Sequence, residues 1–338
     1  MGIDSHTLRR SFGFYDGTLD MSDVVSITFC SDAPDCFDES WNANITDTPE
    51  IMGYLCGTSV YVVGDPIYTH PDCGLMFAAY NTYGDKLWSS LSSIDGLDHL
   101  ITSRTEDMEL MFAFSRVDEL SGIEHWDVSS VKTFAGMFQG NSNSGDSPLR
   151  FVDVSLWDTS SAENLSHVFY GCAKMEYVPI ENWNVSNVKT FSHMFADCYN
   201  LKHIDISRWD TSSAESFDAL LNDCRSIVNI DVSGLDTGNC RQFSQMFENC
   251  VNLESIIGIE SWDVSSADYY AFSEMFHCCY KLEYLDIGSW VAAPDNTARM
   301  FKNCYKLKQI DISGFDMSNN TASQEMFMNC KSLTEIVG

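Results

Sequence analysis

Apolar and polar positions recur along most of the chain with a period near 26 residues. The clearest landmark is a Met-Phe pair or a close variant of it. Its second residue stands at Phe112, Phe138, Phe169, Phe195, Leu221, Phe247, Phe276, Phe301 and Phe327. A Trp landmark recurs in step with it, at Trp126, Trp157, Trp183, Trp209, Trp262 and Trp290, with Leu235 and Phe315 in the same column. One such unit cannot bury its own apolar edge, so the period predicts an array of stacked units that share one core.

Each unit is predicted to run as strand, turn, short helix and turn. Residues 201–207, LKHIDIS, carry apolar side chains with the two-residue period of a strand. Ser212 and Glu215 match the S-x-x-E capping box of a helix start, and residues 217–221 place apolar side chains at i, i+3 and i+4. The predicted fold class is therefore an α/β solenoid, a leucine-rich-repeat-like array with a parallel sheet.

Two regions are expected. Residues 1–75 contain apolar stretches such as DVVSITF and are predicted to form a small β-rich N-terminal cap; residues 76–338 are predicted to form about nine repeats. The segment 140–148, GNSNSGDSP, lengthens one turn and is expected to be a surface loop. The chain stops at LTEIVG, inside a predicted strand, which predicts an uncapped end able to self-associate.

Seven of the thirteen cysteines occupy one repeat position, three residues after the landmark Phe: Cys172, Cys198, Cys224, Cys250, Cys279, Cys304 and Cys330, with Ser115 and Asn141 in the same column. Stacked units about 4.8 Å apart would hold these thiols with parallel Cβ vectors, a poor geometry for disulfides. A row of single thiols also offers no centre for four zinc ligands. We therefore expect a buried column and no metal.

The redox state of the other six cysteines is left open by the sequence: Cys30, Cys36, Cys56, Cys73, Cys240 and Cys278. In an oxidising compartment, Cys30 and Cys36 could close a small loop. The alternative, which we favour, is that these residues are buried free thiols.

The repeated unit resembles the BspA-like leucine-rich repeats, whose typical unit is close to MFxxCxxLxxIDxSxWDTSxVxxMxxMF. Residues 157–330 match this pattern closely, and GLMFAAYN at residues 74–81 is similar to a degenerate first unit. The resemblance implies a curved solenoid used for adhesion and protein recognition, without catalysis. It also implies a place on the surfaces of mucosal bacteria or some parasites; related arrays occur in phage-encoded proteins.

Charge and motifs narrow the function further. The formal net charge is −30, which disfavours nucleic acids and anionic membranes as partners. No apolar run reaches the length of a membrane span, and no signal peptide is recognised. HExxH, GxSxG and P-loop patterns are absent from the sequence, so we expect no enzyme and no cofactor.

An Asp follows most of the landmark Trp residues, in the column Asp127, Asp158, Asp210, Asp236, Asp263 and Asp316. Stacked carboxylates could bind calcium between units. The favoured alternative is that each Asp accepts backbone N–H bonds at the following turn, because Asn184 replaces one of them.

The predicted ligand-binding residues lie in two outward columns of the strand face. The first column contains Phe151, Tyr177, His203, Asn229, Tyr284 and Gln309, together with Ser255. The second contains Asp205, Asp231, Asp286 and Asp311, in line with Asp153, Pro179 and Ile257. The first column varies while its neighbours are nearly fixed in type. A variable column is expected either of a recognition face or of a surface that nothing constrains.

Two functions follow from these patterns. The first is a non-catalytic adhesion module that recognises a protein or glycan through the strand face, on the cell surface or secreted. The second is a structural or receptor-binding component of a phage particle, located in the virion, in which the array is a spacer or an assembly contact. Exposed aromatic residues beside a row of Asp would suit a partner with basic and apolar patches.

Overall fold

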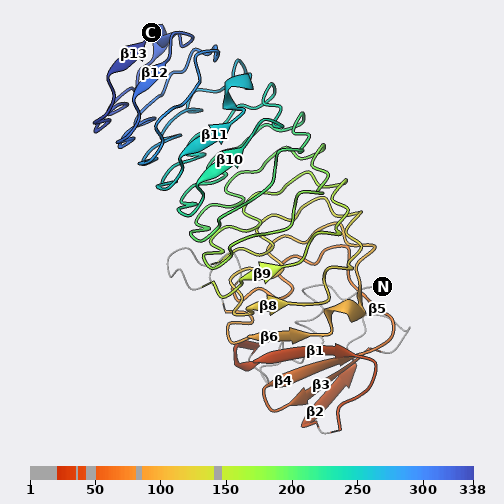
Figure 1. The fold of residues 1–338 in the computed structure, drawn as a ribbon. Coiled ribbons are helices and arrows are strands. Elements are labelled where there is room, and N and C mark those ends of the chain that lie inside the picture. Colours follow the sequence, from red (N-terminus) through yellow and green to blue (C-terminus); the bar gives the residue numbers. More distant parts are fainter. Residues whose placement is uncertain (1–20, 36, 43–50, 81–85, 141–146) are drawn as a thin grey trace.

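The computed structural model of the protein describes residues 21–35, 37–42, 51–80, 86–140 and 147–338. Their chain winds in coils that stack on one another into a curved, elongated body (Figure 1). One hydrophobic cluster runs through this stack from Val24 to Met326. The prediction that the repeated units share a single interior is therefore confirmed.

A five-stranded sheet lies at the N-terminal end of the described chain, in the order β2-β3-β4-β1-β6. Strand β1 is parallel to β4 and β6, whereas β3 is antiparallel to β2 and β4. The strands are β1 Ser26–Cys30, β2 Glu39–Asn42, β3 Met52–Cys56, β4 Ser59–Val63 and β6 Ser93–Asp95. Because β6 comes from a later part of the chain, this sheet continues into the stack, and the division at residue 75 stays a prediction.

Beyond this sheet, the described strands are two or three residues long and form four separate parallel pairs. The pairs are β5 Ile67–Tyr68 with β7 Leu100–Ile101, β8 Glu119–Leu120 with β9 Phe151–Val152, β10 Asn229–Asp231 with β11 Ser255–Ile257, and β12 Gln309–Asp311 with β13 Glu335–Val337.

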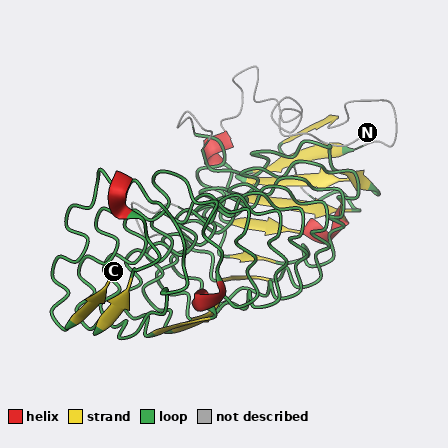
Figure 2. Ribbon diagram, turned by 90° about the horizontal axis from the view of Figure 1, so that it is seen from above, coloured by secondary structure: helices red, strands yellow, loops and turns green. Residues whose placement is uncertain are grey.

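The described residues contain no α-helix. Their helical segments are four short 3₁₀ turns: η1 Met21–Asp23, η2 Leu97–His99, η3 Ile259–Ser261 and η4 Met317–Asn319. Seen from above, most of the stack is loop and turn, and the longer strands gather toward the N-terminal end (Figure 2). The predicted α/β array of strand–turn–helix units with a continuous parallel sheet is therefore wrong.

The backbone of residues 217–224 explains why the predicted helix does not form. An α-helix needs each N–H to bond the carbonyl four residues earlier. Here every second N–H bonds the next coil instead, as Ala219 does to Ser244 (2.8 Å) and Leu221 does to Met246 (3.0 Å). The N–H groups between them close three-residue turns, as Asn222 does to Ala219 (3.1 Å). The segment is thus a ladder of turns whose bonds are shared between coils.

This path places left-handed backbone at two positions in most of the described coils. His193 and Asp197 have φ of 57° and 60°, and Ala219 and Asp223 of the next coil have φ of 49° and 58°. A non-glycine residue in this region costs about 1–2 kcal/mol. The backbone hydrogen bonds between coils offset that cost, because they satisfy N–H groups that would otherwise be buried without partners.

Aromatic columns fill the interior. The rings of Phe138, Phe169 and Phe195 stack with centroids 5.6 Å and 5.5 Å apart. The Trp157 and Trp183 rings stack at 6.3 Å and 4°. Each indole N–H also donates to a carbonyl of the preceding coil, as Trp157 does to Ile123 (2.8 Å) and Trp183 to Val154 (3.0 Å). The Trp column thus satisfies its polar atoms while it is buried.

The periodic cysteines form a second column in the interior. All of them are buried, as predicted, except Cys330, which is half-buried. Each thiol donates to the carbonyl of the landmark residue one coil earlier, as in Cys198 to Phe169 (3.1 Å) and Cys224 to Phe195 (3.2 Å). The same bond recurs for Cys172, Cys250, Cys279, Cys304 and Cys330. A small side chain with a weak donor fits this position because it is apolar and still meets a backbone acceptor.

Three of the remaining cysteines, Cys73, Cys240 and Cys278, are buried thiols, whereas Cys30 and Cys56 are partly exposed. Cys36 and Asn141 lie outside the described residues, as does most of the predicted loop 140–148. The Cys30–Cys36 loop therefore stays a prediction.

Candidate functional site

The first predicted column lies on the surface of the stack. Its members Phe151, Tyr177, His203, Asn229, Tyr284 and Gln309 are all exposed, and Ser255 is half-buried. The alternating burial of residues 151–154, in which Val152 and Val154 point inward, places this column and the Asp column on the same outer face. The aromatic side chains are the notable members, because Phe151 is 49%, Tyr177 37% and Tyr284 62% exposed.

Some side chains of the column contact a side chain of the next coil. Tyr177 and His203 stack with centroids 6.3 Å apart and planes 12° apart. Lys308 lies over the Tyr284 ring at 4.8 Å and donates to its hydroxyl at 3.1 Å. We call the whole first column the aromatic strip; it consists of Phe151, Tyr177, His203, Asn229, Ser255, Tyr284 and Gln309.

The Asp column beside the aromatic strip is held by local turns. Asp205 Oδ1 accepts from the Ser207 N–H (3.1 Å) and hydroxyl (2.7 Å), and Asp231 Oδ1 accepts from Ser233 in the same way. Asp311 Oδ1 accepts from the Ser313 N–H at 2.9 Å. The Ser207 bonds hold the pKa of Asp205 below its ordinary value, so its charge persists in mild acid. The second carboxylate oxygen remains for a ligand.

Four predicted residues come together in a groove of about 430 Å³ at β12 and β13. Tyr284, Asp286, Gln309 and Asp311 line it, along with Leu285, Ile310, Glu335 and Val337. The remaining predicted residues lie farther along the strip and are not part of this groove. The groove combines an aromatic ring, an amide and carboxylates, which are groups that orient a polar ligand against an apolar wall.

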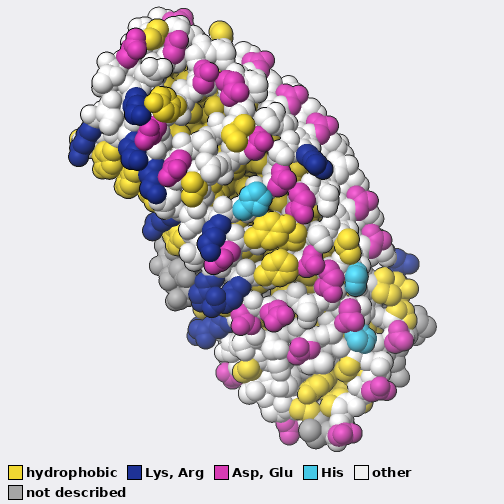
Figure 3. Space-filling view, in the orientation of Figure 1, with side chains coloured by type: hydrophobic (Ala, Val, Ile, Leu, Met, Phe, Trp, Pro, Cys, Tyr) yellow, Lys and Arg dark blue, Asp and Glu magenta, His cyan; other side chains and the backbone are white. Residues whose placement is uncertain are grey.

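Charge is unevenly spread over the face seen in Figure 3. Hydrophobic side chains form a band along the middle, Lys and Arg lie mostly on one flank, and Asp and Glu are most frequent on the other. Several basic residues are paired across coils with the acidic residue one unit earlier, such as Lys202 with Glu176 (2.7 Å) and Lys308 with Glu283 (2.7 Å). Such exposed pairs contribute little to stability, but they fix the charge pattern that a partner meets.

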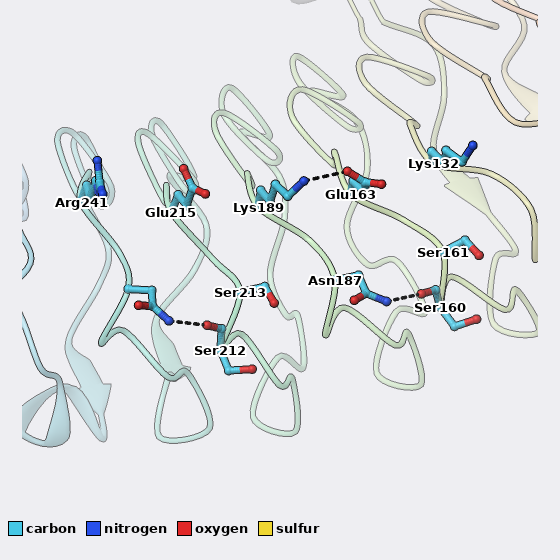
Figure 4. A pocket seen from close by; sticks show the side chains of 11 residues that line it. Lys132, Ser160, Ser161, Glu163, Asn187, Lys189, Ser212, Ser213, Glu215 and Arg241 are labelled. Atoms are coloured by element: carbon cyan, nitrogen blue, oxygen red, sulfur yellow. Dashed lines mark hydrogen bonds and ion pairs between the residues drawn. The ribbon is translucent and has the colours of Figure 1, made fainter.

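A second groove, of about 740 Å³, was not predicted. Lys132, Glu163, Lys189, Glu215 and Arg241 line one side in a single row, and Ser and Asn side chains line the other (Figure 4). These five residues stand at one position of successive units and alternate in sign, a pattern that is visible in the sequence once the repeats are aligned. We call this row the charge ladder.

The charge ladder is bonded through both backbone and side chains. The N–H of Glu163 donates to Lys132 and that of Lys189 donates to Glu163, at 2.8 Å and 2.9 Å. The ammonium of Lys189 lies 2.8 Å from Glu163, and that of Lys132 lies 2.6 Å from Glu106. Ser212 and Glu215, which matched a helix capping box, instead line this groove.

A different set of Asp residues, those that directly follow the landmark Trp residues, also accepts hydrogen bonds within turns. Asp127, Asp158 and Asp263 each accept from the N–H two residues later, at 3.1, 3.0 and 2.9 Å. Asn184 makes the same bond to Ser186 at 3.1 Å. The predicted backbone acceptor role is confirmed, although it starts a turn of the coil rather than a helix. The calcium alternative stays a prediction.

Comparison with known families bears on these repeats. A family model described as "Mycoplasma protein of unknown function, DUF285" matches residues 82–151, 144–258 and 228–337. The chain belongs to the DUF285 family. No curated protein and no solved structure matched the chain. The three overlapping matches to one model identify a repeat protein.

The DUF285 repeats carry a histidine pair that sequence reasoning missed. The rings of His167 and His193 stack with centroids 4.8 Å apart and planes 3° apart, and Asp218 lies 3.8 Å from His193. Burial lowers the pKa of both rings, and His193 lowers that of His167 further. Asp218 and Asp197 oppose these shifts without cancelling them. Both rings are therefore mainly neutral at pH 7.

The stacked rings predict a loss of stability in mild acid. The unfolded chain binds protons at the ordinary histidine pKa of about 6.5, whereas the folded pair binds them at lower pH. The contribution of the two histidines to the free energy of unfolding is therefore complete above pH 6.5, and it falls as the pH decreases toward the pKa values of the folded protein. His193→Gln is expected to reduce the fall in Tm between pH 7.5 and 5.5 by about 2 °C. Equal falls in the two proteins would contradict this prediction, and exposed His203→Gln is the control.

Nothing among the described residues forms a helix with the length and hydrophobicity that a bilayer crossing requires.

Proposed function

We propose that this DUF285 chain is a non-catalytic binding module that recognises a protein partner through the aromatic strip. The observation that carries the proposal is the exposure of Phe151, Tyr177 and Tyr284 in one outward column of a chain that buries most of its aromatic rings. Exposed aromatic side chains are costly to leave in water. They are also the residues that most often contribute large shares of binding energy at protein interfaces.

The chemistry beside the strip supports a partner with basic and apolar groups. Asp205, Asp231 and Asp311 are fixed by their turns, and each keeps one oxygen that the turn does not use. Since these carboxylates are already ordered, little side-chain entropy is lost when a Lys or Arg of a partner binds them. The net charge of −30 would also attract such a partner over a longer distance.

A glycan partner is the second candidate, and the charge-ladder groove favours it. Ser160, Ser212, Asn187 and Asn239 place hydroxyl and amide groups opposite the alternating Lys and Glu residues. Such a groove offers many hydrogen-bond donors and acceptors, which suits a neutral polar chain. We propose this groove as a separate site from the aromatic strip.

The location of the protein is also a proposal. DUF285 repeats are associated with BspA-like repeat proteins, and the sequence pattern of this chain resembles that group. We therefore propose that the module acts outside the cell, on a cell surface or after secretion.

The proposal predicts that the aromatic strip is required for binding. The combined variant Phe151→Ala, Tyr177→Ala and Tyr284→Ala is expected to raise the Kd for a protein ligand at least tenfold, or about 1.4 kcal/mol. The wild-type chain is screened against a panel of purified extracellular proteins and against a glycan array, and the hits are measured by surface plasmon resonance.

Tyr270→Ala is the matched control, because Tyr270 is 58% exposed but lies outside the strip. It should bind as the wild type does. Unchanged binding by the triple variant would overturn the proposal for the strip. Binding to glycans alone, lost on Asn187→Ala and kept by the triple variant, would favour the charge-ladder groove.

A further inference from the structure

A histidine and two glutamates from adjacent coils meet on the surface of the stack at Glu248, Glu274 and His277. One ligand atom of each lies within 4.8 Å of the other two. The His277 Nδ1 atom is 3.0 Å from Glu248 Oε1 and 3.5 Å from Glu274 Oε2. The three side chains are between 9% and 21% exposed, so they are mostly buried but can be reached by solvent.

The turn ladder of the coils brings these residues together. Glu274 and His277 flank the landmark pair of one coil, and the His277 N–H closes a turn on the Glu274 carbonyl at 3.0 Å. Glu274 has a left-handed φ of 57°, and its carboxylate lies 3.5 Å from the His277 ring. Glu248 occupies the position of His277 in the preceding coil, and its neighbour Asn249 donates its N–H to the His277 carbonyl at 2.8 Å.

The outer oxygen of each carboxylate is already held by other residues. Glu248 Oε2 accepts from Asn222 at 2.9 Å and from Gln245, and Glu274 Oε1 accepts from Arg299 at 3.2 Å. The inner oxygens, Glu248 Oε1 and Glu274 Oε2, both point toward the same imidazole nitrogen. Metal-binding carboxylates and histidines are commonly oriented by such outer hydrogen bonds.

Charge in the surroundings is compatible with a cation. Arg299 lies 3.2 Å from Glu274 and 2.9 Å from Glu325, and Lys302 lies 2.7 Å from Glu325, so the carboxylates around the cluster outnumber the basic side chains.

We propose that Glu248, Glu274 and His277 form a binding site for a divalent transition-metal ion of the zinc class. Zinc bonds to His nitrogen and carboxylate oxygen at 2.0–2.2 Å, so tetrahedral ligand atoms stand about 3.4 Å apart. The His277 distances of 3.0 Å and 3.5 Å bracket that value, and the ion would displace the proton that His277 Nδ1 shares with Glu248 and release it to solvent. A water molecule would complete the coordination on the solvent side. This site is independent of the aromatic strip, and the ion would join two successive coils.

The test is a titration of the full chain with ZnCl₂ after treatment with EDTA, followed by calorimetry and by melting. We expect one equivalent of zinc to bind and to raise the Tm, because an ion that binds the folded state alone stabilises it. Glu274→Gln and His277→Gln should each weaken binding at least tenfold. His193→Gln and Glu283→Gln, which alter the same residue types elsewhere, should bind zinc as the wild type does.

Exposed thiols also bind zinc, so the titration is repeated after alkylation and with Co²⁺, whose spectrum distinguishes nitrogen and oxygen ligands from thiolates. A nitrogen and oxygen spectrum that disappears in His277→Gln supports the site. Equal zinc binding by wild type, Glu274→Gln and His277→Gln, or no zinc binding by correctly folded wild type, overturns the proposal. In that case the cluster is an ion pair between His277 and two carboxylates.

Discussion

Replacement of Phe195 by alanine is expected to lower the free energy of unfolding by about 3–5 kcal/mol. Phe195 is fully buried and its ring stacks on Phe169 at 5.5 Å. Removing the ring leaves a cavity in the middle of a column, where coils on both sides lose contact. Chemical denaturation monitored by tryptophan fluorescence measures the change.

The position of Phe195 within the column should make this effect larger than at the surface of the stack. The control is Tyr270→Ala, because Tyr270 is 58% exposed, and it is expected to change the free energy of unfolding by less than about 0.5 kcal/mol. A loss below 1 kcal/mol for Phe195→Ala would mean that neighbouring coils collapse into the space. It would contradict a rigid column. Because the coils contact chiefly their neighbours, the unfolding transition of the variant is also expected to broaden.

The second large effect concerns thiol reactivity. Burial raises the pKa of the Cys172 thiol to about 12 from an ordinary value of 9.0, which lowers the thiolate fraction at neutral pH about a thousandfold. Burial also raises the pKa of Cys198 and Cys224 well above the ordinary value. Since alkylating reagents attack the thiolate, these residues are expected to react at least a thousandfold more slowly in the folded protein than in denaturant.

Mass spectrometry after timed iodoacetamide treatment measures the alkylation rate of each cysteine. Partly exposed Cys56 serves as the internal reference and should be modified first. Cys224 should react only as fast as the stack opens, so its rate should rise in Phe195→Ala. Modification of Cys224 at the rate of Cys56 in the folded protein would contradict the buried thiol column.

The interior of this protein could be predicted from its sequence, but the backbone path could not. The 26-residue period placed the Phe, Trp and Cys columns correctly, because stacking forces equivalent side chains into line. An α-helix and the turn ladder that the structure contains both bury side chains at the spacing of Phe217, Leu220 and Leu221. All three side chains are buried in either case, so the pattern did not distinguish the two.

The feature that decides the path leaves little trace in the sequence. Left-handed backbone usually occurs at glycine, but His193, Ala219 and Asp223 adopt it here. Glycine stands at one of the two positions in only some coils, at Gly136 in the position of His193 and at Gly171 in the position of Asp223. The backbone hydrogen bonds that compensate this conformational strain come from neighbouring coils, so the sequence of a single unit does not reveal them.

The candidate sites also contain some residues that the sequence predicts and others that it does not. The outward direction of Tyr177 and Asp205 follows from the alternation of strand residues and was predictable. The meeting of Glu248 with His277 depends on which side chains lie side by side in adjacent coils of unequal length. The charge ladder is visible in the aligned sequence, but it lies outside the two strand-face columns that were predicted to bind a ligand.

The alternating signs of the charge ladder limit how the number of coils can change. Lys132 and Lys189 lie on either side of Glu163, and Glu163 is paired with Lys189 at 2.8 Å. Loss or duplication of a single coil here would set two like charges against each other, whereas loss or duplication of two coils would restore opposite neighbours. Along this stretch, insertions and deletions therefore preserve the alternation of charge only in even numbers of coils.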